Sequence, residues 1–355
     1  MDGMEMSEDV LTEILAKLPC KSLARFQCVS PSWDRIISSD YLRRRLPLIT
    51  SGVLFHDGPP RGVSGRKQQQ AYTYACASDD GVAEAADMSF FPCHGTSTII
   101  DGCNGLLLYY DASSSYPTPS FHVVNPTTRR WAALPPPRGG KTLLSVLAFD
   151  PRDSPNYKVV CFTGWLPRGA SVEVFDSESG AWREHAAVDF GIDTDAMSAT
   201  MHYSGGALHV LAYSGHVVRL DLDAMDCRVT ALPAPVSCRA RAGHCRGRLR
   251  FASSDGARLK VWELVIKDAG RGEWALRHEV GVKDLGASEA VTFLFMAFHP
   301  EREVVYLWAP WKLVAFDMET RRVEEEWAFG SKKEGAHLIQ IWLFPFTRHL
   351  ANCLA

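Results

Sequence analysis

The sequence predicts a small all-α module followed by an all-β propeller, with six blades favoured and seven as the alternative. Two observations predict this architecture: apolar residues at helical spacing within the first 47 residues, and a strand–turn unit that recurs five times after residue 100. At about 150 residues per domain, 355 residues correspond to one small and one large domain. We place the helical module at 1–47, a linker with a loop and the first blade strands at 48–101, and the propeller at 102–355.

The composition is that of a globular protein with a buried core, with 46% hydrophobic and 22% charged residues. A net charge of −3 predicts no bulk attraction to nucleic acid or membrane, and no apolar run is long enough to span a bilayer. The acidic N-terminus lacks the layout of a signal peptide. The ten Cys form no C-x-x-C pair and the chain has no N-glycosylation sequon, which indicates a cytoplasmic or nuclear protein.

Short helices are expected throughout the first 47 residues. The first begins after an N-cap at Ser7, carries its apolar residues on one face and ends at Pro19. After a second helix, Ser30 and Pro31 supply the N-cap and first position of a third, and a last helical turn covers 41–46. This small unit carries more large apolar side chains than it can bury alone. We therefore expect it to dock on the rest of the chain or on another protein.

Five short blocks in this segment stand in a recognisable order: EIL at 13–15, LP at 18–19, KSL at 21–23, CVS at 28–30, and Trp33. The segment thereby resembles the F-box, although Met6-Ser7 stand where F-boxes usually have Leu-Pro. The resemblance implies binding to a Skp-type adaptor and, through it, to a cullin and a RING subunit. The residues expected to dock on the adaptor are Leu11, Ile14, Leu15, Leu18, Pro19, Leu23, Phe26, Val29, Ser30, Trp33 and Ile37.

The repeat after residue 100 consists of a strand ending in Asn or Asp, a turn, and an apolar residue six positions later. Its Asn or Asp positions, at intervals of 51, 45, 47 and 49 by subtraction, are Asn125, Asp176, Asp221, Asp268 and Asp317. The Asn or Asp side chain opens the turn by bonding the backbone, and Trp131, Trp182 and Trp274 are expected in blade cores. A period in the high forties is typical of kelch-like propeller blades. A terminal strand at 337–346 is expected to complete the first blade.

Seven longer blocks cover the same region in a recognisable order, among them CNGLLLYY at 103–110, VVNPTTRRWAALPPP at 123–137 and VEVFDSESGAWRE at 172–184. Residues 100–330 therefore resemble the F-box-associated domain of the large plant F-box families. The Gly-, Pro- and Gln-rich stretch at 57–70 is expected to form a flexible loop.

Two further features are candidates for contact with a substrate. Trp165, Trp308 and Trp311 lie outside the repeat register, beside Gly, Pro or Ala, which favours inter-strand loops where aromatic residues contact partners. The segment 237–250 holds five Arg and no acid, so it reads either as a site for an acidic or phosphorylated segment or as a solvated loop. The substrate-binding candidates are Arg239, Arg241, Arg246, Trp165 and Trp311.

Neither a metal site nor a cofactor is expected. Cys93-His94 and His244-Cys245 lack the paired spacings of a zinc site, and no nucleophile elbow, phosphate loop or dinucleotide fingerprint occurs. Since propellers also host enzymes built from distant loops, a propeller enzyme is the third and most remote hypothesis.

The sequence predicts a non-catalytic subunit rather than an enzyme. The first hypothesis is the substrate receptor of a Skp–cullin–F-box ubiquitin ligase, in which the F-box binds the adaptor and the propeller recruits a protein for ubiquitination and degradation by the proteasome. The alternative is a propeller that binds a peptide or carbohydrate and has lost its coupling to the ligase.

Overall fold

The protein is described here by a computed structural model. The residues it describes are 7–18, 20–45, 50–57, 71–76, 88–94, 96–111, 120–126, 128–139, 142, 144–237, 240–255, 258–266, 272–281, 293–309, 312–328 and 344–347.

Four helices form the N-terminal module: α1 (Glu8–Leu15), α2 (Cys20–Phe26), α3 (Pro31–Ile37) and α4 (Asp40–Arg45). Both expected N-caps are confirmed, because the Ser7 hydroxyl accepts from the Val10 N–H and the Ser30 hydroxyl accepts from the Trp33 N–H. Pro31 occupies the first turn of α3, where a missing N–H costs nothing. The helices share a core of their own, made of Leu11, Leu15, Leu23, Ile36, Ile37 and Leu42.

Five antiparallel four-stranded sheets follow, each built from four consecutive strands. Blade 1 contains β3 (Thr98–Cys103), β4 (Leu106–Asp111), β5 (Ser120–Asn125) and β6 (Arg130–Ala133). Blade 2 contains β7 (Leu144–Ala148), β8 (Lys158–Leu166), β9 (Gly169–Asp176) and β10 (Ala181–Asp189). Blade 3 contains β11 (Met197–Ser204), β12 (Ala207–Ala212), β13 (His216–Asp221) and β14 (Cys227–Ala231).

The last two blades repeat the same up-and-down order. Blade 4 contains β15 (Arg241–Cys245), β16 (Arg248–Ser254), β17 (Arg258–Ile266) and β18 (Gly272–Gly281). Blade 5 contains β19 (Leu294–Phe298), β20 (Val304–Ala309), β21 (Lys312–Asp317) and β22 (Arg322–Ala328). A short 3₁₀ helix, η1 (Thr194–Ala196), lies between blades 2 and 3.

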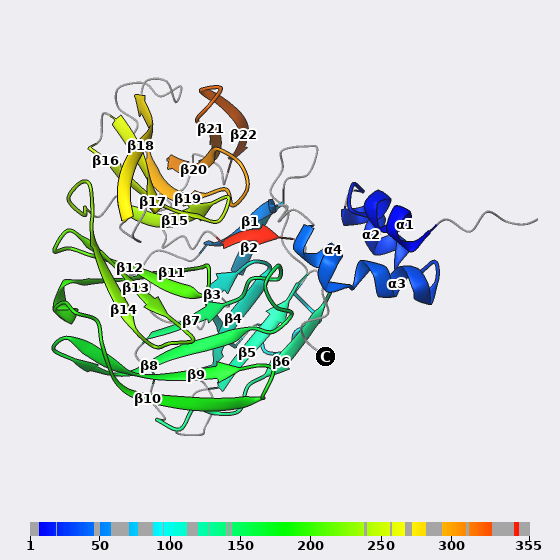
Figure 1. Ribbon diagram of the computed structural model, residues 1–355, viewed down its shortest axis with the longest axis horizontal. Helices are drawn as coiled ribbons and strands as arrows, with labels where there is room; N and C mark the ends of the chain where they lie inside the picture. Colours follow the sequence, from blue (N-terminus) through cyan, green and yellow to red (C-terminus); the bar gives the residue numbers. More distant parts are fainter. Residues whose placement is uncertain are drawn as a thin grey trace, which may run out of the picture.

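The expected number of blades needs correction, since the described residues form five four-stranded blades rather than six or seven. A further sheet has three strands, in the order β2 (Ala71–Cys76), β1 (Thr50–Asp57) and β23 (Phe344–Thr347). Here the C-terminal strand pairs with β1, with Leu54 opposite Phe344, so the expected joining of the two ends of the chain is confirmed over 344–346 (Figure 1). Of the loop expected at 57–70, Asp57 instead ends strand β1, and 58–70 lie outside the described residues.

The first strand of each blade lies innermost, because β3, β7, β11, β15 and β19 contact one another in turn along the ring. Strand direction alternates within a blade, so turns between first and second strands open on one face and turns between second and third strands on the other. Large apolar cores fill the spaces between neighbouring blades, for example Phe149, Phe175 and Trp182 between blades 1 and 2. Figure 1 shows the helices as a separate group beside the three-stranded sheet.

The predicted repeat coincides with the turn between the third and fourth strands of each blade. Asn125, Asp176, Asp221 and Asp317 each end a third strand, and each side-chain oxygen accepts a backbone N–H two or three residues later at 2.8–3.1 Å. This is the turn chemistry that the sequence predicts. Asp268 lies outside the described residues.

The three repeat tryptophans do not behave alike. Trp182 is buried, and its indole N–H donates to the Pro135 carbonyl at 2.7 Å, which ties blade 2 to the chain leaving blade 1. Trp274 is half-buried and donates to the Ala231 carbonyl of blade 3 at 2.8 Å. Trp131 is 40% exposed, so the expectation of a core position is wrong there; within the described residues, the sheet that precedes blade 1 has three strands rather than four.

Candidate functional site

The helical module leaves apolar side chains exposed although its own core is complete. Val10 and Ile14 are 51% and 44% exposed on one face of α1, one helical turn apart. Val29, after α2, is 59% exposed, and Tyr41 on α4 is 54% exposed. Exposed apolar groups concentrated on so small a unit mark an interaction surface.

The expected docking residues divide by burial. Leu11, Leu15, Leu23 and Ile37 are buried in the helical core, so these four expected docking residues pack against the other helices rather than lie on the surface. Leu18, Phe26, Ser30 and Trp33 are half-buried, and Ile14 and Val29 are exposed. Pro19 lies outside the described residues.

Three polar and aromatic contacts fix the shape of this surface. Phe26 packs edge-on against Trp33, with ring centroids 5.2 Å apart, so two half-buried rings are held together. Ser30 is occupied as the cap of α3. The Glu13 carboxylate accepts from the Tyr41 hydroxyl and pairs with Arg45, which joins α1 to α4, and these hydrogen bonds lower the pKa of Glu13.

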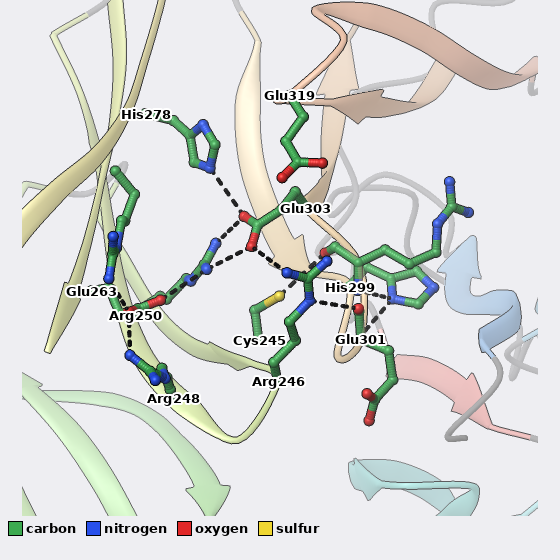
Figure 2. Close-up of polar contacts among 12 residues, drawn as sticks. Cys245, Arg246, Arg248, Arg250, Glu263, His278, His299, Glu301, Glu303 and Glu319 are labelled. Atoms are coloured by element: carbon green, nitrogen blue, oxygen red, sulfur yellow. Dashed lines mark hydrogen bonds and ion pairs between the residues drawn. The ribbon is translucent and has the colours of Figure 1, made fainter. Parts of the chain in front are cut away.

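The Arg-rich segment forms an internal ion network between blades 4 and 5 (Figure 2). Arg250 on β16 is 3% exposed, and its guanidinium donates to the carboxylates of Glu263 on β17 and Glu303 beside β20. Arg248 also donates to Glu263 at 3.0 Å, and Arg246 lies 3.7 Å from Glu303. Arg246, Arg248 and Arg250 are therefore paired with Glu263 and Glu303.

The network changes the ionisation of its carboxylates. Burial by itself raises the pKa of Glu303, but the hydrogen bonds and charges of Arg250 and His278 outweigh burial and lower the pKa to about 2. The pKa of Glu263 is also lowered, because hydrogen bonds from Arg277, Arg250 and Arg248 outweigh its burial. Both carboxylates consequently stay ionised near neutral pH.

This arrangement weakens the expectation that the arginines bind substrate. Arg246 donates through Nε to the Glu301 carbonyl at 3.2 Å, and Arg241 donates to the Ala240 carbonyl at 2.8 Å. Arg239 lies outside the described residues. Each described arginine of this segment spends part of its five N–H donors on carbonyl or carboxylate groups of the chain, which leaves fewer for a phosphorylated segment.

A hollow of about 610 Å³ lies where the helical module meets the propeller. Arg44 of α4 lines it together with the turns that join first and second strands, which contribute Asp150, Arg152, Asp153, Ser204, Gly205 and Gly247. Arg152 pairs with Asp150 and reaches Glu301 of blade 5 at 2.9 Å, so the charges here also pair with one another. The hollow places α4 on the face formed by the first-to-second-strand turns.

The opposite face carries exposed aromatic groups. Trp165 lies at the end of β8 and Tyr213 directly follows β12, so both stand at turns between second and third strands. Trp165 is 42% exposed and Tyr213 is 60% exposed. By contrast, Trp308 lies within β20 rather than on a loop, and Trp311 lies outside the described residues.

The two Cys–His neighbours serve other contacts. His94 Nδ1 is 3.0 Å from the Tyr109 hydroxyl, and His244 Nδ1 is 2.6 Å from His202 Nε2. The Cys245 thiol donates to the Arg302 carbonyl. Within the described part of the chain, no group of three or more His, Cys, Asp or Glu is arranged to hold a metal ion, and no helix there is long and apolar enough to cross a membrane.

Comparison with protein families assigns both parts of the chain. Residues 4–45 match the F-box domain. Residues 85–335 match the family described as F-box protein At3g26010-like, beta-propeller, which is more than half of the chain. The chain belongs to the F-box proteins with a C-terminal β-propeller.

Two curated relatives of this F-box protein are from Arabidopsis thaliana. The F-box protein At5g07610 is 27% identical over 79% of this chain and 71% of its own length. The putative F-box/kelch-repeat protein At1g15680 is 24% identical over 90% of this chain and 83% of its own. Among solved structures, TolB from Acinetobacter baumannii matches with a TM-score of 0.42 and 12% identity over 85% of this chain and 70% of that one, which says nothing about function.

Several surface residues of this F-box protein escaped prediction from the sequence. Val10 and Tyr41 were absent from the expected docking set, although Val10 stands one helical turn before Ile14. Leu166 directly follows Trp165 in GWLP, and Tyr213 directly precedes a Ser-Gly turn. A large apolar residue beside a tight turn between strands is the signal that identifies both.

Proposed function

We propose that this F-box protein is the substrate-receptor subunit of a Skp–cullin–F-box ubiquitin ligase. The observation that carries the proposal is the exposed apolar surface of the helical module, with Val10, Ile14, Val29 and Tyr41 left uncovered around a complete core. The half-buried Leu18, Phe26 and Trp33 extend the apolar area available to a Skp-type adaptor. A cullin and a RING subunit join through that adaptor.

In this role the chain performs no bond chemistry. It holds a protein substrate near the ubiquitin conjugate carried by the ligase, and this proximity raises the effective concentration of the target lysine. The propeller supplies a rigid platform, because its blades are joined by apolar cores, by indole hydrogen bonds and by the Arg250 network. We place the complex in the cytoplasm, the nucleus or both.

Association with the adaptor tests the proposal. The full chain is co-expressed with a Skp-type adaptor and examined by size exclusion with light scattering, and the expected result is a one-to-one complex. Helix-in-groove interfaces concentrate affinity in a few anchors, so Val29→Asp is expected to weaken adaptor binding by at least about tenfold in calorimetry.

Ile266→Asp is the matched control, because Ile266 is an apolar residue 64% exposed at the end of β17, outside the helical module. It is expected to bind the adaptor as the wild type does. Failure of the wild-type chain to bind any Skp-type adaptor overturns the ligase role and leaves a propeller binding module.

A further inference from the structure

Two neighbouring turns of blades 2 and 3 present large side chains on the face away from the helical module. Trp165 and Leu166, each 42% exposed, end β8, and Tyr213, 60% exposed, directly follows β12. We call these three residues the aromatic ridge. Trp165 also borders the apolar core between blades 2 and 3, because its ring packs against Phe162 and Phe190 of that core.

The aromatic ridge is held in place by its neighbours. The η1 turn joins both hairpins: the Thr194 N–H donates to the Pro167 carbonyl at 3.0 Å, and the Tyr213 N–H donates to the Ala196 carbonyl. The Trp165 ring stacks on Phe162 with centroids 5.4 Å apart and an angle of 9°. A surface ordered before binding loses little conformational entropy when a partner arrives.

The surroundings of the aromatic ridge are acidic. Asp189 ends β10, Asp193 caps η1 and Asp195 lies within it, and all three residues are exposed. The nearby Arg168 is exposed too, and its guanidinium donates to the Gly191 carbonyl at 2.9 Å. Three carboxylates against one guanidinium repel polyanions and attract cationic segments.

We propose that the aromatic ridge binds a segment of the substrate protein in which an apolar or aromatic side chain is flanked by Lys or Arg. The apolar side chain packs on Trp165, Leu166 and Tyr213, and the basic residues face the three carboxylates. This inference rests on the proposed function in one respect, namely that the bound protein is then ubiquitinated. Because α4 lies on the other face of the propeller, adaptor and substrate occupy the chain together.

Fluorescence polarisation with the purified full chain tests the inference. The probes are short labelled peptides, each with one Trp, Phe or Leu among Lys and Arg residues, and a matched set in which Glu replaces every Lys and Arg. The basic peptides are expected to bind saturably, with an affinity that falls as salt is raised, and the acidic peptides are expected not to bind. Absence of binding by every basic peptide, or equal binding by both sets, overturns the inference.

Two variants locate the binding. Tyr213→Ser is expected to weaken binding of the basic peptides by at least about tenfold, and Asp195→Asn is expected to weaken it less and to reduce its salt dependence. Ile266→Ser, which removes an equally exposed apolar side chain at the end of β17, is expected to leave peptide binding unchanged. Equal losses in Tyr213→Ser and Ile266→Ser contradict the assigned site.

The adaptor assay distinguishes failure of this inference from failure of the proposed function. Tyr213→Ser is expected to form the same complex with the Skp-type adaptor as the wild type. Peptide binding without adaptor binding would overturn the ligase role and support the aromatic ridge as a peptide site. Adaptor binding without peptide binding would support the ligase role and overturn the peptide site.

Discussion

Two regions of the propeller contain residues that the sequence predicts as substrate contacts, the Arg-rich segment and the aromatic ridge around Trp165, and they differ in how far the fold already occupies them. The arginines between blades 4 and 5 are paired with Glu263 and Glu303, with Arg250 only 3% exposed. The aromatic ridge of blades 2 and 3 is at least 42% exposed at each of its residues. The number of charges in a segment therefore says less about binding than whether the fold has already satisfied them.

The largest loss of stability is expected when the arginine–glutamate network between blades 4 and 5 is broken. Arg250→Met leaves two buried carboxylates short of their main partner, and we expect it to lower the free energy of unfolding by about 3 kcal/mol in urea denaturation. Arg248→Met is the control, because its side chain is 59% exposed, and should cost less than about 1 kcal/mol. Equal small losses in both variants would contradict a structural role for the network.

Acid should weaken the same network. The pKa of Glu303 lies at about 2 in the folded protein and near 4.5 when unfolded, so its stabilising contribution is full above 4.5 and is lost as the pH falls toward 2. Each unit of pKa shift corresponds to about 1.4 kcal/mol. Melting temperatures measured across that range should fall more steeply for the wild type than for Glu303→Gln, and parallel curves would refute the ionised pair.

A smaller effect is expected where blades are joined by neutral groups. Trp182→Phe removes the hydrogen bond to the Pro135 carbonyl and part of a buried ring, and should cost about 1–2 kcal/mol in urea denaturation. Trp131→Phe, at the equivalent repeat position but 40% exposed, should cost less than about 0.5 kcal/mol. Similar losses in the two variants would mean that the repeat position, not burial, sets stability.

The smallest change in stability is expected in the aromatic ridge, in contrast to the arginine–glutamate network. Tyr213→Ser should change the free energy of unfolding by no more than about 0.5 kcal/mol, because the side chain is 60% exposed. Urea denaturation of this variant should overlay that of the wild type. A loss as large as that of Arg250→Met would show that Tyr213 supports the fold rather than a partner.

Features that depend on near neighbours were predictable from the sequence. The cap at Ser30 and the turns at Asn125, Asp176, Asp221 and Asp317 rest on hydrogen bonds to residues two or three positions away. Their side chains act locally, so their residue types reveal them.

Features that depend on distant partners were not predictable. Glu303 is 53 positions from Arg250, and nothing in the Arg-rich segment indicates that this carboxylate will reach it. The exposure of Trp131 depends on which sheet precedes blade 1, and the number of blades depends on how the ends of the chain pair. Leu11 and Leu15 share the apolar pattern of Ile14, and only the packing of the four helices makes the first two core residues and leaves Ile14 on the surface.

The central claim is that the helical module docks on the adaptor while one propeller face stays free for substrate. Hydrogen–deuterium exchange of the full chain, measured with and without a saturating Skp-type adaptor, tests it most directly. We expect the adaptor to protect amides within residues 7–45 and to leave the exchange of residues 158–216 unchanged. Unaltered exchange in the helices, or protection of the aromatic ridge by the adaptor, would contradict it.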